Sequence, residues 1–256
     1  MSPAQVVTYE VDTGVAWLTI NRPEARNAVN QAARDALWAG VRRFNDDPRA
    51  EVLVVTGAGD QAFCAGGDLR EMSETGLQVP PRDFVPQFGV NVVVDKPTIA
   101  AVNGVAYAGG FLLAMHCDLC VAAEHARFAI TEAKVGRGAP WAASLPWLIP
   151  PRVALEILLT AEPISAARAH QLGLVNAVVA STDLRGAAER LARTIMANAP
   201  LSVRAAKQMV YNSAEVGRRA AYDAAERIWE PAYLSEDAQE GPRAFSEKRP
   251  PEWKGR

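Results

Sequence analysis

Two glycine-rich bends in this chain are placed to point backbone N–H groups at an oxygen atom that gains negative charge. The first, Ala65-Gly66-Gly67, follows a predicted strand over residues 51–56, and the second, Ala108-Gly109-Gly110, follows one over residues 98–102. Glycine lets a ligand approach the main chain, and the first N–H groups of a helix lack an intrahelical partner. Two such donors aimed at one point form an oxyanion hole. The alternative is that the glycines serve only tight turns between strand and helix.

A third candidate group is the carboxylate of Glu132, which follows a predicted strand over residues 127–131. An apolar site raises the pKa of a carboxyl group, so that it can take up and return a proton near neutral pH. No other Asp or Glu lies between Lys134 and Leu155. From its place at the end of a predicted strand, Glu132 is a candidate functional carboxylate; the alternative is a surface or salt-bridged carboxylate.

Repeated strand-then-helix units must position these groups, and they predict an α/β fold. Asn30 is predicted to cap a helix over residues 31–45. The apolar face of that helix is expected to contain Ala32, Ala36, Leu37, Val41 and Phe44. Further helices are expected over residues 202–212 and 214–234, followed by a basic, proline-broken tail over 245–256. We therefore expect a core over residues 1–199 and a separate helical region over 200–256.

Composition argues against several classes of protein. The chain has 256 residues, 49% of them hydrophobic, and a net charge of −2, which argues against nucleic-acid binding as its main activity. No apolar run approaches the length of a membrane span, and residues 1–10 lack the pattern of a signal peptide. Three cysteines fit a reducing compartment, so a cytoplasmic location is expected.

Several short motifs match the patterns of other kinds of site, but each fits its pattern poorly. Residues 57–62 match a dinucleotide-binding pattern, yet no helix is expected to open directly on its last position. Cys117 and Cys120 have a redox spacing in apolar surroundings, which favours buried, unreactive thiols. His116, His125 and His170 form no metal-ligand spacing with them, so no metal site is expected.

The chain resembles the enoyl-CoA hydratase/isomerase (crotonase) superfamily along nearly its whole length. The residues that carry the match lie at 21–23, 27–28, 62–69, 103–118, 128–136, 166–175 and 198–200. The resemblance implies a spiral of ββα units and a C-terminal helical region that forms trimers, often paired into hexamers. It also implies an acyl-CoA thioester substrate, as in fatty acid metabolism, with coenzyme A as part of the substrate and no separate cofactor.

Carried over by position, the resemblance assigns the two oxyanion-hole N–H groups to Gly67 and Gly109. It implies that a set of further residues contacts coenzyme A or the acyl group. On the core these are Arg22 or Arg26 at the phosphates, Asn27 and Ala28 beside the channel, Ala65, Gly66, Asp68 and Leu69 along the adenine and pantetheine, and Leu112 and Trp141 at the acyl chain. Phe245 and Lys248 are expected to reach coenzyme A from a neighbouring subunit.

The resemblance also separates possible reactions. Hydratases of the superfamily use two glutamates to hold a water molecule; here the first position is Leu112 and the second is Glu132. One carboxylate suffices to move a proton from C2 to C4 of a 3-enoyl thioester, and residues 108–112 and 139–141 resemble the Δ3,Δ2-enoyl-CoA isomerase branch. We therefore expect an isomerase.

Other interpretations stay open. Leu112 is alternatively an ordinary core leucine, whose presence says nothing about the mechanism. The chain is alternatively a hydratase, lyase or hydrolase that recruits Glu74 or Asp83 from residues 73–89, a segment expected to cover a pocket. A homologue that binds acyl-CoA with little catalysis is the third interpretation.

Overall fold

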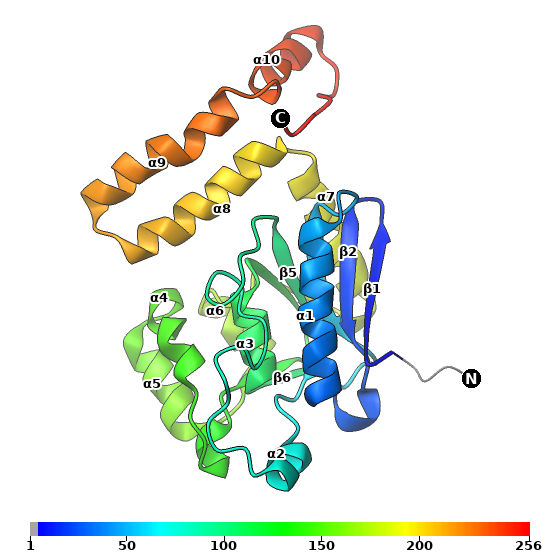
Figure 1. Cartoon of the computed structure of the whole chain (residues 1–256), viewed down its shortest axis with the longest axis vertical. Coiled ribbons are helices and arrows are strands. Elements are labelled where there is room, and N and C mark those ends of the chain that lie inside the picture. Colours follow the sequence, from blue (N-terminus) through cyan, green and yellow to red (C-terminus); the bar gives the residue numbers. More distant parts are fainter. Residues whose placement is uncertain (1–4) are drawn as a thin grey trace.

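The structure, a computed structural model, describes residues 5–256 and divides its strands between two sheets (Figure 1). The large sheet has the order β1 (Val7–Asp12), β2 (Val15–Ile20), β3 (Val52–Gly57), β5 (Thr98–Val102), β7 (Leu119–Ala123) and β10 (Ala177–Val179). The small sheet has the order β4 (Ala62–Cys64), β6 (Val105–Tyr107), β8 (Arg127–Ala129) and β9 (Ile164–Ser165). All neighbours are parallel except the pairs β1–β2 and β8–β9.

Each turn of the chain gives one strand to each sheet and then a short helix. The successive turns are β3, β4 and α2 (Leu69–Thr75), then β5, β6 and α3 (Gly109–His116), then β7, β8 and the 3₁₀ helix η2 (Glu132–Val135). This confirms the expected spiral of ββα units. Because β4, β6 and β8 are parallel neighbours, the segments that follow them meet at one edge of the small sheet.

One strand in this spiral was not expected. Between the predicted strand over residues 98–102 and the second glycine bend, the chain forms β6, and α3 begins within that bend, at Gly109. A strand of three residues is too short to show a period of two in the sequence. Its pairing with β4 and β8 is what defines it.

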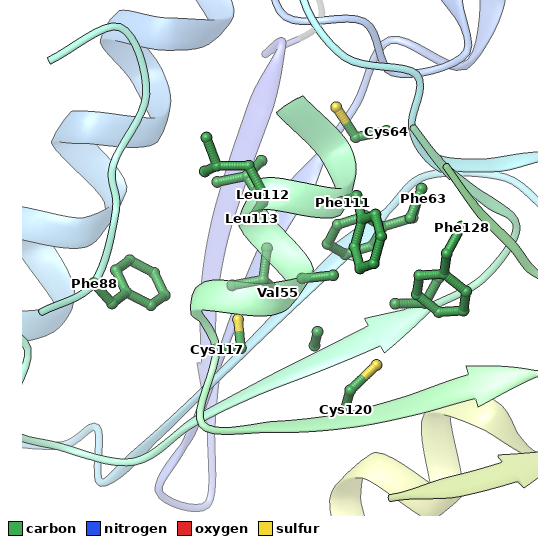
Figure 2. Packing of buried hydrophobic residues seen from close by; sticks show 14 of the residues in the cluster. Val55, Phe63, Cys64, Phe88, Phe111, Leu112, Leu113, Cys117, Cys120 and Phe128 are labelled. Carbon is green, nitrogen blue, oxygen red and sulfur yellow. The ribbon is translucent and has the colours of Figure 1, made fainter. Parts of the chain in front are cut away.

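The core lies on both faces of the large sheet. One face packs against α1 (Gln31–Asp46) and α3, and the other against α7 (Leu184–Met196). Side chains of a strand alternate between faces, so Leu53 and Val55 join the first cluster while Val52 and Val54 join the second. Figure 2 shows Phe63, Phe111 and Phe128 gathered beside α3, and the Phe111 and Phe128 ring centroids are 5.6 Å apart.

Helix α1 begins as predicted, because the Asn30 side chain accepts a hydrogen bond from the Ala33 N–H at 3.0 Å. Its buried face differs by one position: Ala33 is buried and Ala32 is exposed. Leu37, Val41 and Phe44 are buried as expected. The difference follows from helical spacing, because Ala33 lies four residues before Leu37 and so shares its face, whereas Ala32 does not.

The remaining helices of the core are short. They are η1 (Pro23–Ala25), η3 (Pro140–Ser144), α4 (Leu145–Leu148), α5 (Pro151–Thr160), α6 (Ala166–Gln171) and η4 (Ser181–Asp183). Within residues 5–256 no helix is long and apolar enough to cross a membrane. Residues 1–4, part of the segment considered for a signal peptide, lie outside the described residues.

The C-terminal region is a helical arm. Helices α8 (Pro200–Glu215) and α9 (Arg218–Tyr233) lie side by side and extend away from the sheets (Figure 1). Helix α10 (Asp237–Glu247) lies beyond the two helices predicted for this region, and it contains Pro242, a residue that weakens a helix interior. Long-range contacts hold it: Asp237 accepts hydrogen bonds from the Lys254 N–H at 2.6 Å and the Gly255 N–H at 2.9 Å.

Gly110 fixes how closely α3 approaches β4, since a β-carbon at this position would lie 2.0 Å from the Cys64 carbonyl oxygen. We expect Gly110→Ala to push α3 away from β4 and to lower the free energy of unfolding by about 3 kcal/mol, the upper range for overpacking. Urea denaturation measures this quantity. Gly217→Ala is the matched control, because no atom lies within 4 Å of the added carbon. Equal stabilities of the two variants would contradict the prediction.

Candidate active site

The first glycine bend is held in place by the loop that precedes α1. Val29 N–H donates to the Gly66 carbonyl oxygen at 2.8 Å, and Ala65 N–H donates to the Arg26 carbonyl oxygen at 3.0 Å. Gly66 has φ +99°, a conformation that side chains with a β-carbon rarely adopt. Asp68 then caps α2 by accepting from Arg70 N–H at 3.2 Å. The bend is therefore a fixed element rather than a loose turn.

The second bend is strained. Ala108 has φ 49° and ψ −119°, which is unusual for a residue other than glycine. Its N–H donates to the Ala129 carbonyl oxygen at 2.9 Å, so the bend is tied to the end of β8. Gly109 is the first residue of α3, where N–H groups have no intrahelical acceptor. Strain of this kind persists where the surrounding structure enforces it, and it gathers at functional sites.

The two bends are in contact. A β-carbon on Gly109 would lie 3.6 Å from the Gly66 α-carbon and 3.8 Å from the Gly67 nitrogen. Within residues 5–256, neither the Gly67 N–H nor the Gly109 N–H has a hydrogen-bond acceptor. Both residues line one cavity. The geometry therefore provides two adjacent unpaired donors at a ligand-accessible surface, the arrangement that an oxyanion hole requires.

The cavity has a volume of about 770 Å³ and lies between α3, η2, η3 and residues 78–91. Such a volume is typical of small-molecule sites. Of the residues predicted to bind ligand or act in catalysis, seven line it: Ala65, Gly67, Leu69, Gly109, Leu112, Glu132 and Trp141. Residues of the segment 73–89, which was expected to cover a pocket, also line the cavity. Among the described residues, Glu132 is the only Asp or Glu in the lining.

Glu132 is half-buried, and its two carboxylate oxygens have different surroundings. Oε1 accepts a hydrogen bond from the Trp141 Nε1–H at 3.0 Å, while Oε2 is buried without a partner. Burial raises the pKa of Glu132 above its ordinary value, and the hydrogen bond from Trp141 opposes part of that shift. The carboxyl is thus oriented, desolvated and left with one free oxygen, which suits a group that accepts and returns a proton.

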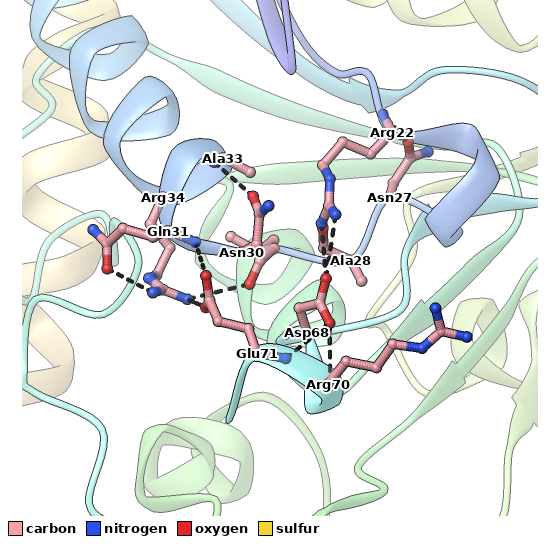
Figure 3. Close-up of polar contacts among 12 residues, drawn as sticks. Arg22, Asn27, Ala28, Asn30, Gln31, Ala33, Arg34, Asp68, Arg70 and Glu71 are labelled. Atoms are coloured by element: carbon pink, nitrogen blue, oxygen red, sulfur yellow. Dashed lines mark hydrogen bonds and ion pairs between the residues drawn. The ribbon is translucent and has the colours of Figure 1, made fainter. Parts of the chain in front are cut away.

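The predicted phosphate-binding arginines behave differently from each other. Figure 3 shows the Arg22 guanidinium directed at Asp68, and both of its terminal nitrogens lie 3.2 Å from Asp68 Oδ2. Burial alone would raise the pKa of Asp68, but the Glu71 N–H and Arg22 together lower it. Arg22 and Asp68 therefore hold each other and the bend. Arg26 is exposed, and its side chain has no ion-pair partner in residues 5–256.

Asn27 has a structural position that the sequence did not suggest. Its side chain is fully buried, donates to the Ala58 carbonyl oxygen at 3.0 Å and the Ala62 carbonyl oxygen at 2.7 Å, and accepts from the Arg22 N–H at 2.9 Å. A direct side-chain contact with a ligand is not available to it. Ala28 and Gly66 also lie outside the cavity lining, although their segments support the bend.

The remaining predicted residues lie away from this cavity. Phe245 and Lys248 are at the end of α10, exposed, and distant from α2 in the same chain (Figure 1). Asp83 lines a different cavity beside α1, and Glu74 lines neither. The structure thus offers no second carboxylate from residues 73–89 to the site.

The other sequence motifs lie outside the cavity as well. The dinucleotide-like residues 57–62 lead into β4 rather than a helix, so the fingerprint is not formed. All three cysteines are buried, and burial raises the pKa of Cys64 and Cys120 to about 12, which confirms the interpretation as buried thiols. Within residues 5–256 no group of three or more His, Cys, Asp or Glu could hold a metal ion.

Two of the polar cavity residues that sequence reasoning missed are His116 and Arg137. His116 lies seven positions after Gly109 and four after Leu112, so helical spacing places the three on one face of α3. That spacing was a usable signal. Arg137 gave no signal in the sequence, because its hydrogen bonds go to backbone atoms. It donates to the carbonyl oxygens of Leu77 and Gln78 at 3.0 and 3.1 Å, which ties the end of η2 to residues 73–89, the covering segment.

Comparison with known proteins places this architecture among acyl-CoA enzymes. Residues 10–256 match a family model described as enoyl-CoA hydratase/isomerase. Carnitinyl-CoA dehydratase from Salmonella arizonae is 39% identical over 248 residues, covering 93% of this chain and 94% of that protein. A probable enoyl-CoA hydratase/isomerase from Mycobacterium abscessus is 40% identical with a TM-score of 0.88, covering 99% of this chain and 100% of that one. An enoyl-CoA hydratase from Bacillus anthracis is 31% identical, with a TM-score of 0.88 over 98% and 100% of the two chains.

The hydrogen bond from Trp141 lowers the pKa of Glu132, so Trp141→Phe is expected to raise it further. A raised folded-state pKa favours the folded protein below the unfolded-state value, and that contribution is lost as pH rises through the folded-state value. The variant should therefore lose more stability than the wild type as pH rises from acid to neutral. Carbon NMR of the Glu132 carboxyl measures the pKa directly.

Trp253→Phe is the matched control for this experiment. It also removes one indole N–H donor, to the Ala197 carbonyl oxygen at 2.9 Å, but outside the cavity. An unchanged Glu132 titration in Trp141→Phe, or an equal shift in both variants, would show that the bond does not set the pKa.

Proposed function

Because the chain belongs to the enoyl-CoA hydratase/isomerase family of acyl-CoA enzymes, we propose that it moves a double bond within an enoyl-CoA thioester. One observation carries the proposal. Two adjacent unpaired N–H groups, of Gly67 and Gly109, and a single half-buried carboxylate, of Glu132, line the same cavity. These are the groups that proton transfer next to a thioester carbonyl needs.

The two amides stabilise the charge that the reaction creates. Removing a proton from C2 of an acyl thioester produces an enolate, whose negative charge rests largely on the thioester oxygen. In our proposal this oxygen accepts hydrogen bonds from the Gly67 and Gly109 N–H groups. Loss of one such donor typically costs about 3 kcal/mol of barrier height. Because both donors are backbone groups fixed by neighbouring strands, no rearrangement is needed when charge develops.

Glu132 carries the proton. In a 3-enoyl thioester, Oε2 takes the C2 proton and returns one to C4, which leaves the double bond between C2 and C3. Trp141 holds Oε1, so Oε2 remains the reacting oxygen. Burial raises the pKa of Glu132, which brings its basicity closer to that of the enolate intermediate. No water molecule takes part, which agrees with the apolar Leu112 in the lining.

A second candidate is the dehydration of a 3-hydroxyacyl-CoA, or its reverse. The observation that favours it is the names of the relatives, carnitinyl-CoA dehydratase and enoyl-CoA hydratase. Here Glu132 would take the C2 proton and deliver a proton to the departing C3 hydroxyl, releasing water. One carboxylate can perform both transfers if the two bonds lie on the same side of the acyl chain. An acyl-CoA-binding homologue with little turnover is the remaining outcome.

We also propose that the C-terminal arm assembles the chain into trimers or pairs of trimers. Large apolar side chains on α9 and α10 are exposed in the isolated chain, including Tyr222, Tyr233, Leu234 and Phe245. Burial of such a surface favours association. Phe245 and Lys248 do not reach their own cavity, so a contact with coenzyme A would come from a neighbouring subunit.

The decisive variant is Glu132→Gln, assayed on paired 2-enoyl- and 3-enoyl-CoA esters. We expect kcat for the 3-enoyl ester to fall by about 10² to 10⁴, the usual contribution of a general acid/base, with ester affinity retained. Ultraviolet absorbance follows the conjugated product, and calorimetry measures affinity. The wild type should form the 2-enoyl ester without a 3-hydroxyacyl ester.

Glu74→Gln and Asp83→Asn are matched controls, since both carboxylates lie outside the cavity. Both should leave turnover unchanged. Interconversion of 2-enoyl and 3-hydroxyacyl esters by the wild type would favour the second candidate over the first. Ester binding without any turnover would leave only the binding homologue.

A further inference from the structure

His116 is a cavity residue to which the proposed reaction gives no role. It is the last residue of α3, and its Nδ1 lies 3.3 Å from the Phe88 carbonyl oxygen. A carbonyl oxygen only accepts hydrogen bonds, so Nδ1 carries the proton in this contact. In the neutral ring, Nε2 is then a bare acceptor. Burial lowers the pKa of His116 below its ordinary value, which favours that neutral ring.

The Nε2 atom has no partner. Across residues 5–256, only two buried side-chain polar atoms lack a hydrogen bond: His116 Nε2 and Glu132 Oε2. An unsatisfied buried polar group lowers stability, so native proteins contain few of them. Both of these belong to residues that line one cavity. The two unpaired acceptors therefore belong to the walls of the same cavity.

The position of His116 on α3 decides what it can contact. Gly109, Leu112 and His116 lie on one face of the helix, and its rise of 1.5 Å per residue puts His116 about 10 Å from Gly109 along the axis. The reacting C2 atom is bonded to the thioester carbonyl carbon and stays near Gly109. His116 is therefore too far along the cavity to exchange the C2 proton. It faces the part of the acyl group that extends past Leu112.

The lining of the cavity is largely apolar, and it includes Phe84, Val85 and Val90. Asn91 also lines the cavity, but its side chain is already bonded to the backbone of its own segment: its Nδ2 donates to the Arg82 and Val85 carbonyl oxygens at 2.8 and 3.0 Å. The Nε2 atom of His116 thus offers an acceptor in largely apolar surroundings, where a matching donor on the ligand is strongly selected.

We propose that His116 is a specificity-determining residue, whose Nε2 accepts a hydrogen bond from a hydroxyl group on the acyl chain, remote from the thioester. The substrate class is then a hydroxylated acyl-CoA rather than a plain fatty acyl-CoA. This inference rests on the proposed function, because it assumes an acyl-CoA in the cavity. It adds which acyl groups that cavity prefers.

The test measures the affinity of straight-chain acyl-CoA esters of increasing length, each with and without a terminal hydroxyl, by calorimetry. At the length that reaches His116, the wild type should bind the hydroxylated ester about tenfold more tightly than the plain one. His116→Asn should abolish this preference and keep its fold. The Asn side-chain nitrogen is separated from Cα by the same number of bonds as Nδ1, so it retains the donor to Phe88 but lacks the Nε2 acceptor.

Two further variants separate recognition from a structural role. His116→Leu should prefer the plain ester and bind it more tightly than the wild type does, because the unpaired Nε2 acceptor is removed. Loss of the contact between His116 and Phe88, by itself, would lower the affinity for both esters equally. His125→Asn is the matched control: His125 is exposed, contacts the Asp60 carbonyl oxygen and Ser181 Oγ, and lies outside the cavity. It should keep the wild-type preference.

The outcomes distinguish this inference from the proposed function. If plain and hydroxylated esters bind equally at every length while turnover still depends on Glu132, the role of His116 is overturned and the proposed function stands. A preference that survives His116→Asn overturns the inference in the same way. If no acyl-CoA ester binds at all, both fail together.

Discussion

The structure depends on the close approach of two backbone segments, the glycine bends after β4 and β6. Side chains at these positions would prevent it: a β-carbon on Gly110 would lie 2.0 Å from the Cys64 carbonyl oxygen, and one on Gly66 would lie 2.8 Å from the Ala108 β-carbon. The contact also holds Ala108 in a strained conformation. The N–H groups of Gly67 and Gly109, each of which would otherwise be an ordinary unpaired donor in a turn, therefore lie next to each other.

The single carboxylate beside this pair shows how opposing effects set its chemistry. Burial disfavours the charged form of Glu132, while the hydrogen bond from Trp141 favours it. The carboxyl keeps one oxygen oriented and one free, at the cost of a buried acceptor without a partner. A core optimised for stability alone would not retain such an atom. Its location in the cavity is what the proposed proton transfer would require.

A polar cluster anchors the helical arm to the large sheet. Lys207 and Tyr211 of α8 contact the two carboxylate oxygens of Asp118 at 2.9 and 2.8 Å, and Asp118 also accepts from the Thr98 N–H at 2.7 Å. These contacts lie where β5 and β7 begin. The arm is thus joined to the ends of the strands remote from the glycine bends, and its exposed apolar side chains take no part in these contacts.

The sequence by itself determined the elements whose signals are local. The glycine bends, the Asn30 cap and the alternation of strands and helices were predicted from neighbouring residues, whereas the roles of Glu132 and Leu112 came from the resemblance. Such features depend on backbone freedom, capping and side-chain period, which a few consecutive residues express. The resemblance to a known family then gave the order in which the units coil.

Only the tertiary structure decided which groups meet. The pairing of Arg22 with Asp68, the burial of Asn27 and the bond from Trp141 to Glu132 each join residues that no local pattern relates. Strand β6 and helix α10 likewise exist because distant segments complete their hydrogen bonds. Their energies come from contacts between separate parts of the chain, and burial, which sets the pKa of Glu132, is defined only once those parts have packed.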